Sequence, residues 1–592
     1  MLSIPDYCVI VAYFVFLVGI GWSFHKDSSD SSDYFRGGGL MAWWLAGSSA
    51  FMASFSAWTF TGAAGVAYKS GIIIMWLYLA GAAGFLVNWK WFGARFRQLR
   101  VIVIMEAVRK RFGPRNEQFF TWTWAPMQIV GAGIWLYGLS IFCAPAFGFD
   151  LRTMIVICGV VACFVSVVGG SWGVAVNDFF QSILLMPIAV IVSIYSLLSV
   201  GGITSLVDKM PAENLSLLGP AASGFGVLWI IAVFIERVTG INNLQMAGRY
   251  LSVIDGGHAR KASLLCAVLF LVGTAMWFIP AFAARAANMD VAGMFPSLTA
   301  PEEGAYVAMA HFHLPPGLFG LLVTGIISAT LSSMDGALNK NAGIMVRSFY
   351  LPVLRPKASE KELVLAGRLV TLFFGLVVLL IALFYTTLKD AGAFKIMFTF
   401  TAMAGVPCVL PMFWCLLVRR TPDWAGWSTV LVGLLTSCAI AFFPDIFRHL
   451  GIADAPWLEA ANNWLAQNHY SATLLGNLVT CSAWFLAVSR LFRPSTDPSR
   501  VREVADFFDS MSRPLAPDEK GSPAAAAAQA YKIGIVALSC GAALMLLLLG
   551  PNTATGRLAV LACALFAGGI GFVLVLINRK RRHAAPHENT AG

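Results

Sequence analysis

The feature of this sequence that most constrains its fold is a succession of apolar runs of about 20 residues, the length that crosses a lipid bilayer as an α-helix. Of the 592 residues, 58% are hydrophobic and only 12% are charged, which is too few for the surface of a soluble protein. We therefore expect an all-α integral membrane protein with about fifteen transmembrane helices. The runs are centred near Val11, Met52, Leu79, Ile129, Val160, Ile188, Ile231, Leu269, Ile327, Val378, Val406, Val432, Leu475, Ala542 and Leu565.

Lys and Arg residues are spread unevenly over the segments between these runs. If the N-terminus lies outside the cell, the inside segments hold most of the 41 basic residues, with a dense group between residues 90 and 115. Basic loops are retained in the cytoplasm, so we expect a multi-pass protein of the plasma or inner membrane with its N-terminus outside and its C-terminus inside. The net charge of +11 then belongs to the cytoplasmic face and does not indicate nucleic-acid binding.

The cysteines and histidines do not form the patterns of a metal or redox site. The eleven cysteines include no CxxC pair, and none of the eight histidines lies in the middle of an apolar run. A disulfide framework, a zinc site and a haem site are therefore not expected. An enzyme embedded in the membrane would need a nucleophile and base, or a metal cluster, at depth. The sequence offers neither, so we do not expect an enzyme.

A run of small and polar residues, from Gly325 to Tyr350, lies near the end of the ninth apolar run. Residues three and four apart share one face of a helix, so Ala329, Ser332 and Ser333 would present a backbone carbonyl and two hydroxyls together. Such oxygen ligands suit small, hard cations. Ser and Gly also occur in transmembrane helices because they allow close packing. From these residues alone, cation binding and helix packing both remain open.

Two of the runs contain residues that interrupt helices. The second, over residues 43–59, is rich in Ser and Gly, and the seventh has Glu236, Arg237 and two asparagines within residues 236–243. Broken helices at membrane depth are tolerated where the freed backbone groups line a cavity or bind an ion. Because the two runs are five apart, their positions suggest an inverted repeat of five helices plus five.

Three stretches resemble the sodium:solute symporter family, which includes sodium-coupled sugar, proline and sialic-acid symporters. They are YFRGGGLMAWWLAGSSAFMASFSAWTFTGAAGVAYKSG, TGINNLQMAGRYLSVIDGGHARKAS, and SATLSSMDGALNKNAGIMVRSFY with KELVLAGR after it. The resemblance covers roughly residues 5–440 and implies a leucine-transporter-type fold, a 5+5 inverted repeat with extra N- and C-terminal helices. We accordingly expect a first helix and inside loop (1–42), a ten-helix transporter core (43–420), and additional C-terminal helices with a cytoplasmic tail (421–592).

The resemblance also implies a sodium site that joins the second run to the ninth. Its ligands would be the backbone carbonyls of Met52 and Phe55, the Ala329 carbonyl, and the hydroxyls of Ser332 and Ser333. Sodium is thus the expected coupling ion.

A possible second cation site would consist of Asp178, Ser332 and Asp335. Some family members use an acidic residue matching Asp178 to bind another sodium, but Asp335 and Gly336 stand where those members have serines. Two nearby carboxylates favour a shared proton, so this site could hold sodium, carry a proton or act as a gate. Alternatively, Asp178 could be an exposed residue at a helix end.

The sequence departs from the family most at the solute site. Thr59 and Tyr78 stand where sugar-transporting members have Gln and Glu, and Glu236 stands where they have Asn. Glu236 could accept hydrogen bonds from sugar hydroxyls or pair with an ammonium group, whereas Arg237 could bind a carboxylate. The same pair could also balance other buried charges without touching a ligand. The candidate solute-binding residues are Thr59, Tyr78, Glu236, Arg237 and Thr239, with Thr399, Thr401, Trp58, Trp76 and Trp135 nearby.

Together these expectations describe a sodium-coupled secondary active symporter that imports a small polar organic solute, favouring a sugar or sugar-like compound, by alternating access. An organic-acid or amino-acid symporter on the same scaffold, and a sodium-independent uniporter or sensor, remain alternatives. The expected partners are the solute, the sodium ion and the lipid bilayer, for a chain that is a monomer or a loose homo-oligomer.

Overall fold

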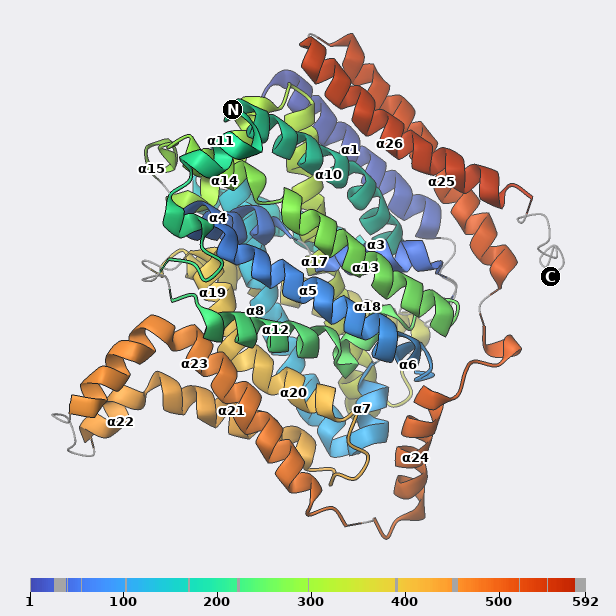
Figure 1. Ribbon diagram of the computed structural model, residues 1–592. Helices are drawn as coiled ribbons and strands as arrows, with labels where there is room; N and C mark the ends of the chain where they lie inside the picture. Colours follow the sequence, from blue (N-terminus) through green and yellow to red (C-terminus); the bar gives the residue numbers. More distant parts are fainter. Residues whose placement is uncertain are drawn as a thin grey trace.

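The computed structural model is built from helices, and its described residues contain one isolated parallel β-bridge, between Met41 and Val253 (Figure 1). The described residues are 2–25, 39, 41–54, 56–101, 104–168, 171–220, 224–296, 298–388, 392–449, 456–493, 495–520, 522–550 and 552–580. The first part of the chain forms α1 (Ile4–His25), α3 (Trp43–Ala53), η2 (Thr59–Ala63), α4 (Ala64–Ser70), η3 (Gly71–Ile74), α5 (Met75–Val87), η4 (Asn88–Phe92), α6 (Gly93–Arg97), α7 (Ile104–Phe112), α8 (Pro114–Phe147), α9 (Leu151–Val168) and α10 (Ser171–Ser199).

The middle and last parts of the chain continue the helical pattern. The middle part forms α11 (Gly202–Lys209), η5 (Ala212–Leu215), α12 (Val227–Ile241), η6 (Leu244–Arg249), α13 (Gly256–Met276), α14 (Ile279–Ala286), α15 (Val291–Met294), η7 (Pro301–Gly304), α16 (Ala305–His313), α17 (Leu318–Met345), η8 (Val346–Leu354), α18 (Glu360–Tyr385), α19 (Ala393–Phe400), η9 (Thr401–Gly405) and α20 (Val406–Trp414). The last part forms α21 (Ala425–Ala441), α22 (Phe443–His449), α23 (Pro456–Ser489), α24 (Pro498–Ser512), η10 (Pro517–Glu519), α25 (Pro523–Met545), η11 (Leu546–Leu549) and α26 (Ala554–Asn578).

The all-helical membrane fold expected from the sequence is confirmed. Among the described residues, ten helical stretches are long and apolar enough to cross a membrane, and three further apolar helices are shorter. Each of the fifteen expected centres falls within a helix. The number of helices that cross the membrane and the five-plus-five repeat remain predictions.

The central helix of the bundle is α17, whose most apolar stretch is completely buried in the protein. It contacts α1, α3, α8, α9, α10 and α18. Its N-terminal end is held by Asp6 of α1, whose carboxylate accepts hydrogen bonds from the backbone N–H groups of Gly317 and Gly320, each at 2.7 Å. Gly320 must lack a side chain there, because a Cβ would lie 2.6 Å from the Asp6 backbone. The ninth run is therefore fixed in the interior.

The break expected in the second run is present. Helix α3 ends at Ala53 and helical structure resumes at Ala57, before η2 and α4. The backbone N–H of Ala57, which a continuous helix would have satisfied internally, donates to the hydroxyl of Thr330 on α17 at 2.9 Å. Phe55 lies outside the described residues.

The interruption in the seventh run begins later than its charged pair. Helix α12 continues through Glu236 and Arg237 to Ile241, and the chain leaves the helix at Asn242 and Asn243. Their side-chain amides donate to carbonyls of the last turn: Asn242 donates to the Val238 carbonyl at 2.8 Å, beside its own backbone N–H at 3.2 Å, and Asn243 donates to the Gly240 carbonyl at 2.6 Å. The two amides, rather than the charges, therefore end this helix.

The C-terminal helices form two attachments on the core. Helix α24 packs on α6 and α7, and its Arg500 pairs with Asp423 at 2.9 Å. Helices α25 and α26 form a hairpin at the edge of the molecule, red in Figure 1. The hairpin meets the core at one end, where the hydroxyl of Tyr195 on α10 donates to the Thr555 carbonyl at 2.7 Å.

Candidate functional site

The expected sodium ligands that the structure describes lie on α3 and α17, two helices in contact. Met52 is buried in the last turn of α3, just before the break. On α17, Ser333 donates its hydroxyl hydrogen to the Ala329 carbonyl at 3.1 Å, so two of the expected ligand oxygens are adjacent. A hydroxyl that donates its hydrogen keeps two lone pairs, so Ser333 can also face a cation. The donor set consists of oxygen atoms, which suits sodium.

The carboxylate of Asp178 connects three helices at this place. It accepts hydrogen bonds from Ser49 of α3, at 2.5 Å, and from Ser332 of α17. Asp178 is fully buried, two turns into α10, so the alternative of an exposed residue at a helix end is wrong. The structure therefore brings together two of the three residues expected at the second cation site.

The third of these residues, Asp335, is oriented toward α9. Its carboxylate accepts a hydrogen bond from Asn339, one turn along α17, and Asn339 also donates to the Ser166 carbonyl of α9 at 3.0 Å. Thr371 of α18 donates to the Asn339 side chain at 3.2 Å. Asp335 and Asp178 are nevertheless close enough to interact electrostatically.

Two basic side chains stand beside this pair of carboxylates. Arg249, at the end of η6, donates to the Ser49 carbonyl at 2.9 Å and interacts with Asp178, and Lys340 interacts with both Asp178 and Asp335. The formal charges of the four groups cancel. Sequence reasoning missed Ser49, Thr330 and Arg249, although all three lie within the stretches that carry the family resemblance. The Ser-rich composition of residues 43–59 was a usable signal for Ser49.

Thr59 and Tyr78, two expected solute-binding residues, are in direct contact. The Tyr78 hydroxyl donates to the Thr59 hydroxyl at 3.1 Å, and both side chains are buried. The Tyr78 ring also meets Trp277 and Phe278 edge-on, at centroid distances of 5.3 and 5.1 Å. Thr59 is the first residue of η2, so this pair lies just beyond the break in the second run.

Glu236 and Arg237 form an ion pair with each other, with 3.2 Å between Arg237 Nε and Glu236 Oε2. Arg237 interacts electrostatically with Tyr78, and both charges interact with Tyr470 of α23. The Thr239 hydroxyl takes no part in the ion pair of Glu236 and Arg237. Its hydroxyl donates to backbone carbonyls of its own helix, and the residue lines an apolar pocket with residues of α20 and α23.

The aromatic residues expected nearby have different roles. Trp58 stacks on Phe394 and Phe398 of α19, at centroid distances of 5.6 and 5.9 Å, and donates to the Ala393 carbonyl at 3.3 Å. Trp58, the residue before Thr59, is therefore held against α19. Trp76 instead donates to the Leu217 carbonyl at 2.9 Å, whereas Trp135 is partly buried against the core. Thr399 lines a cavity with Phe394 and Phe398, the rings on which Trp58 stacks, and Thr401 begins η9.

Comparison with known proteins gives one family. A protein-family model described as "Sodium:solute symporter family" matches residues 34–427 of the sequence. Solute carrier family 5 member 4 of Rattus norvegicus is 26% identical over 62% of this chain and 60% of its own length, so the chain spans less than two thirds of that relative. The osmoregulated proline transporter OpuE of Bacillus subtilis (strain 168) is 23% identical over 72% of this chain and 86% of its own length.

A solved structure has the same fold. A Na⁺-coupled sialic acid symporter in a substrate-bound, outward-open state superposes with a TM-score of 0.66 and 20% identity, over 83% of this chain and 99% of its own. The leucine-transporter-type fold is thereby confirmed. Because the family model covers well over half of the sequence, including both halves of the oxygen-rich site, this chain belongs to the sodium:solute symporter family.

Proposed function

We propose that this sodium-coupled symporter imports a small polar organic solute by alternating access, and that a sugar or sugar-like compound is favoured over an organic acid or an amino acid. The observation that carries the proposal is the group of oxygen atoms on α3 and α17 at the break between Ala53 and Ala57. Sodium bound there would join an interrupted helix to a continuous, buried one. Binding would therefore favour one arrangement of the two helices over another.

In this proposal the transported sodium is held by the carbonyls of Met52, Phe55 and Ala329 and by the hydroxyls of Ser332 and Ser333. The hydroxyl hydrogen of Ser332 is directed at Asp178, which leaves the oxygen lone pairs of Ser332 free to face the ion. Asp178 would then act on the ion by orienting the Ser332 hydroxyl, since Arg249 and Lys340 offset its own charge.

At the possible second cation site of Asp178, Ser332 and Asp335, we propose a gate or proton site rather than a second transported sodium. Arg249 and Lys340 already supply two positive charges to the two carboxylates. A further cation would have to enter a cluster without net negative charge, which removes most of the electrostatic attraction.

The gradient of a single sodium is sufficient for accumulation of a neutral solute. A membrane potential of roughly 100 mV contributes about 2.3 kcal/mol per charge moved inward. A tenfold sodium gradient adds about 1.4 kcal/mol. Together they support a solute ratio of about three decades, and a second sodium would raise this to about five.

For the solute, we propose a site beside the break. It is formed by Thr59, Tyr78, Glu236 and Arg237, and by Thr239 on the same helix as the charged pair. Two hydroxyls and a carboxylate are suited to the hydroxyl groups of a sugar. Arg237 favours the alternative of an organic acid, because its guanidinium could bind a carboxylate. Its pairing with Glu236 weighs against this alternative.

We also propose that residues 43–420 form the transport core, with residues 1–42 and 421–592 as additions. The distribution of Lys and Arg supports an N-terminus outside and a C-terminus in the cytoplasm, in the plasma or inner membrane. The proposed activity is transport without chemical change of the solute. The proposed oligomeric state is a monomer or a loose homo-oligomer.

The test is uptake by the purified protein in sealed liposomes, with an inward sodium gradient and a panel of radiolabelled sugars, sugar acids and amino acids. We expect at least one sugar to accumulate above its external concentration, and to stop accumulating when potassium replaces sodium. Equilibration with either cation would indicate a uniporter. Recovery of a chemically altered solute, detected by mass spectrometry, would indicate an enzyme. Each of these results would overturn the proposal.

A further inference from the structure

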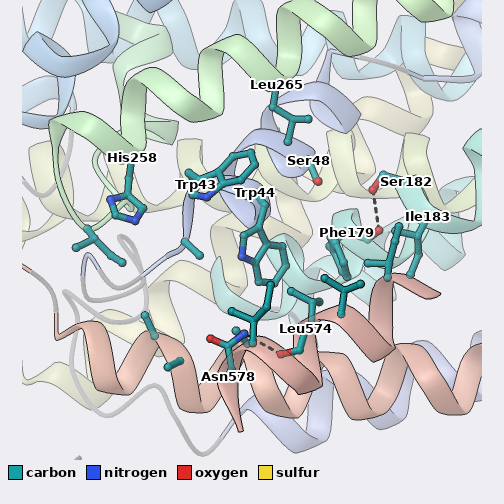
Figure 2. A pocket seen from close by; sticks show the side chains of 18 of the residues that line it. Trp43, Trp44, Ser48, Phe179, Ser182, Ile183, His258, Leu265, Leu574 and Asn578 are labelled. Atoms are coloured by element: carbon teal, nitrogen blue, oxygen red, sulfur yellow. Dashed lines mark hydrogen bonds between the residues drawn. The ribbon is translucent and has the colours of Figure 1, made fainter. Parts of the chain in front are cut away.

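A cavity of about 1420 Å³ lies between the core and the C-terminal hairpin. One wall is formed by α3, α10 and α13, and the other by α25 and α26 (Figures 1 and 2). The volume exceeds the ~300–1000 Å³ of pockets for drug-sized ligands. The cavity takes no part in the sodium or solute sites described above.

The shape of the cavity follows from how the hairpin is attached. At one end of the helices the hairpin packs tightly on the core, where Tyr195 donates to the Thr555 carbonyl and a Cβ on Gly556 would lie 3.0 Å from Pro315. Toward the other end, Asn578 of α26 and His258 of α13 line opposite sides of the cavity. The hairpin and the core therefore separate toward the end of the bundle that carries His258 and Asn578.

The walls are mainly apolar and aromatic. Trp43 and Trp44 of α3 lie between α13 and the C-terminal helices, as Figure 2 shows. The Trp44 ring meets Phe179 of α10 edge-on at a centroid distance of 4.8 Å. Leu265 and Leu574 face the same space. Since α10, α13, α25 and α26 are long and apolar enough to cross a membrane, the occupant of the cavity must be compatible with hydrocarbon.

The mouth of the cavity carries an excess of positive charge. Lys520, Asn578 and His258 line it, and exposed Arg579 and Lys580 follow Asn578 directly. Two acidic side chains that the structure describes there are paired: Asp255 contacts His258 at 2.9 Å, and Glu519 binds Arg100 at 2.7 Å. Arg579 and Lys580, together with Lys520, which also interacts with Asp255, are the positive charges that face an anion beside a cavity lined with hydrocarbon groups.

We propose that this cavity binds one glycerophospholipid with an anionic headgroup. Its acyl chains would lie against Trp43, Trp44 and α26, and its phosphate would lie at Lys520 and the basic end of α26. Clefts between membrane helices with basic residues at the cytoplasmic side suit anionic lipids in this way. The lipid would touch α3 directly, because Ser48 lines the cavity. The next residue, Ser49, donates to Asp178, so the lipid would lie one residue from the charged side chains around Asp178.

The first test measures contact between lipid and the two tryptophans, with the full-length protein in liposomes. Lipid with brominated acyl chains quenches tryptophan fluorescence on contact. We expect Trp43→Phe with Trp44→Phe to remove part of the quenching produced by brominated phosphatidylglycerol. An unchanged quenched fraction in this variant would overturn the site.

A second variant fills the cavity. Gly569 of α26 lines it and has open space where a Cβ would stand, so Gly569→Phe should exclude the acyl chain and reduce quenching as the tryptophan variant does. Gly367→Phe on α18 is the matched control, because a Cβ there also meets no atom within 4 Å. Equal quenching in both glycine variants would contradict binding in this cavity.

The headgroup is tested by comparing brominated phosphatidylglycerol with brominated phosphatidylcholine. We expect the anionic lipid to be enriched at the site about threefold or more, and the enrichment to disappear in a variant with Lys520→Gln, Arg579→Gln and Lys580→Gln. Equal quenching by both lipids in the unaltered protein would overturn the anionic selectivity. Native mass spectrometry of the detergent-purified protein should show one retained phosphatidylglycerol, and its absence would count against the proposal.

Discussion

Ser332 of α17 donates a hydrogen bond to the carboxylate of Asp178 on α10, so an expected sodium ligand and the expected second-site carboxylate are in direct contact. The same carboxylate accepts a hydrogen bond from Ser49 of the interrupted helix. A change in the position of α3 must therefore change the surroundings of Ser332, which couples the cation site to the helix with the break.

The first prediction concerns the two hydroxyls of the proposed sodium site. Ser332→Ala with Ser333→Ala should raise the sodium concentration for half-maximal uptake by roughly an order of magnitude or more, because two ligand oxygens are lost. Ser328→Ala, which removes a buried hydroxyl one turn away on the same helix, should leave that concentration unchanged. Unaltered sodium dependence in the double variant would rule out the site.

The second prediction concerns the hydrogen bond from the Ala57 backbone to Thr330, which stabilises the break in the second run. Thr330→Val keeps the shape of the side chain but leaves the buried N–H of Ala57 without its acceptor, at 2.9 Å in the structure. We expect a loss of about 1–3 kcal/mol of stability, measured as a lower melting temperature of the purified protein. Thr330→Ser retains the hydroxyl and should lose much less. If the two variants melt alike, the hydrogen bond is not what stabilises the break.

Much of this arrangement follows from local sequence. Apolar runs of about 20 residues predict helices in a membrane wherever they fall, and each expected centre falls in a helix. The Ser-rich composition of residues 43–59 predicted the break, because Ser and Gly weaken regular helical hydrogen bonding. The spacing of Ala329, Ser332 and Ser333 predicted a shared face, since helical geometry depends on sequence distance alone.

The remaining features depend on contacts between distant parts of the chain. Thr330 accepts from a backbone group 273 residues away, and Arg249 reaches Ser49 from another helix. A local pattern cannot reveal such pairs. An interruption was expected within residues 236–243, where Glu236 and Arg237 pair with each other and remain helical, so the helix ends only at the asparagines.

The third prediction concerns coupling stoichiometry. Arg249 and Lys340 balance the carboxylates of Asp178 and Asp335, so one sodium should move per solute. With a neutral solute in proteoliposomes, the potential that cancels net flux at known gradients should correspond to one charge per solute. Lys340→Gln removes one fixed cation and should raise the sodium affinity of the cluster. A measured ratio of two in the unaltered protein would contradict the balance of charges.

The fourth prediction separates solute binding from sodium binding. Glu236→Gln removes the charge that pairs with Arg237 at 3.2 Å while keeping the shape of the side chain. We expect the solute concentration for half-maximal uptake to change about tenfold, because a charged hydrogen-bond acceptor becomes neutral. The sodium dependence of a thermal-shift signal should be retained. If uptake of every transported solute is unaltered, Glu236 has a structural role only.

The last prediction concerns Glu303 of η7, outside the membrane-spanning segments. Its buried carboxyl group accepts the backbone N–H of Phe394, at the start of α19, at 3.3 Å, and Gly65 of α4 packs against its side chain. Burial is the main cause that raises the pKa of Glu303 from 4.5 to about 8, and neighbouring Glu302, which pairs with Lys69 at 3.5 Å, adds to the shift.

Because the pKa of Glu303 is higher in the packed state than when the carboxyl is exposed, the packed state is favoured while the group stays protonated. This contribution is fully present below pH 4.5 and is lost as the pH rises to about 8. We therefore expect the melting temperature of the unaltered protein to fall between pH 5 and pH 9 more steeply than that of Glu303→Gln, which stays neutral throughout. Glu302→Gln, at a more exposed carboxylate, serves as the control and should retain most of the pH dependence. Parallel melting curves for Glu303→Gln and the unaltered protein would show that this carboxyl is charged in the packed state, and the contact between η7 and α19 would then not respond to pH through Glu303.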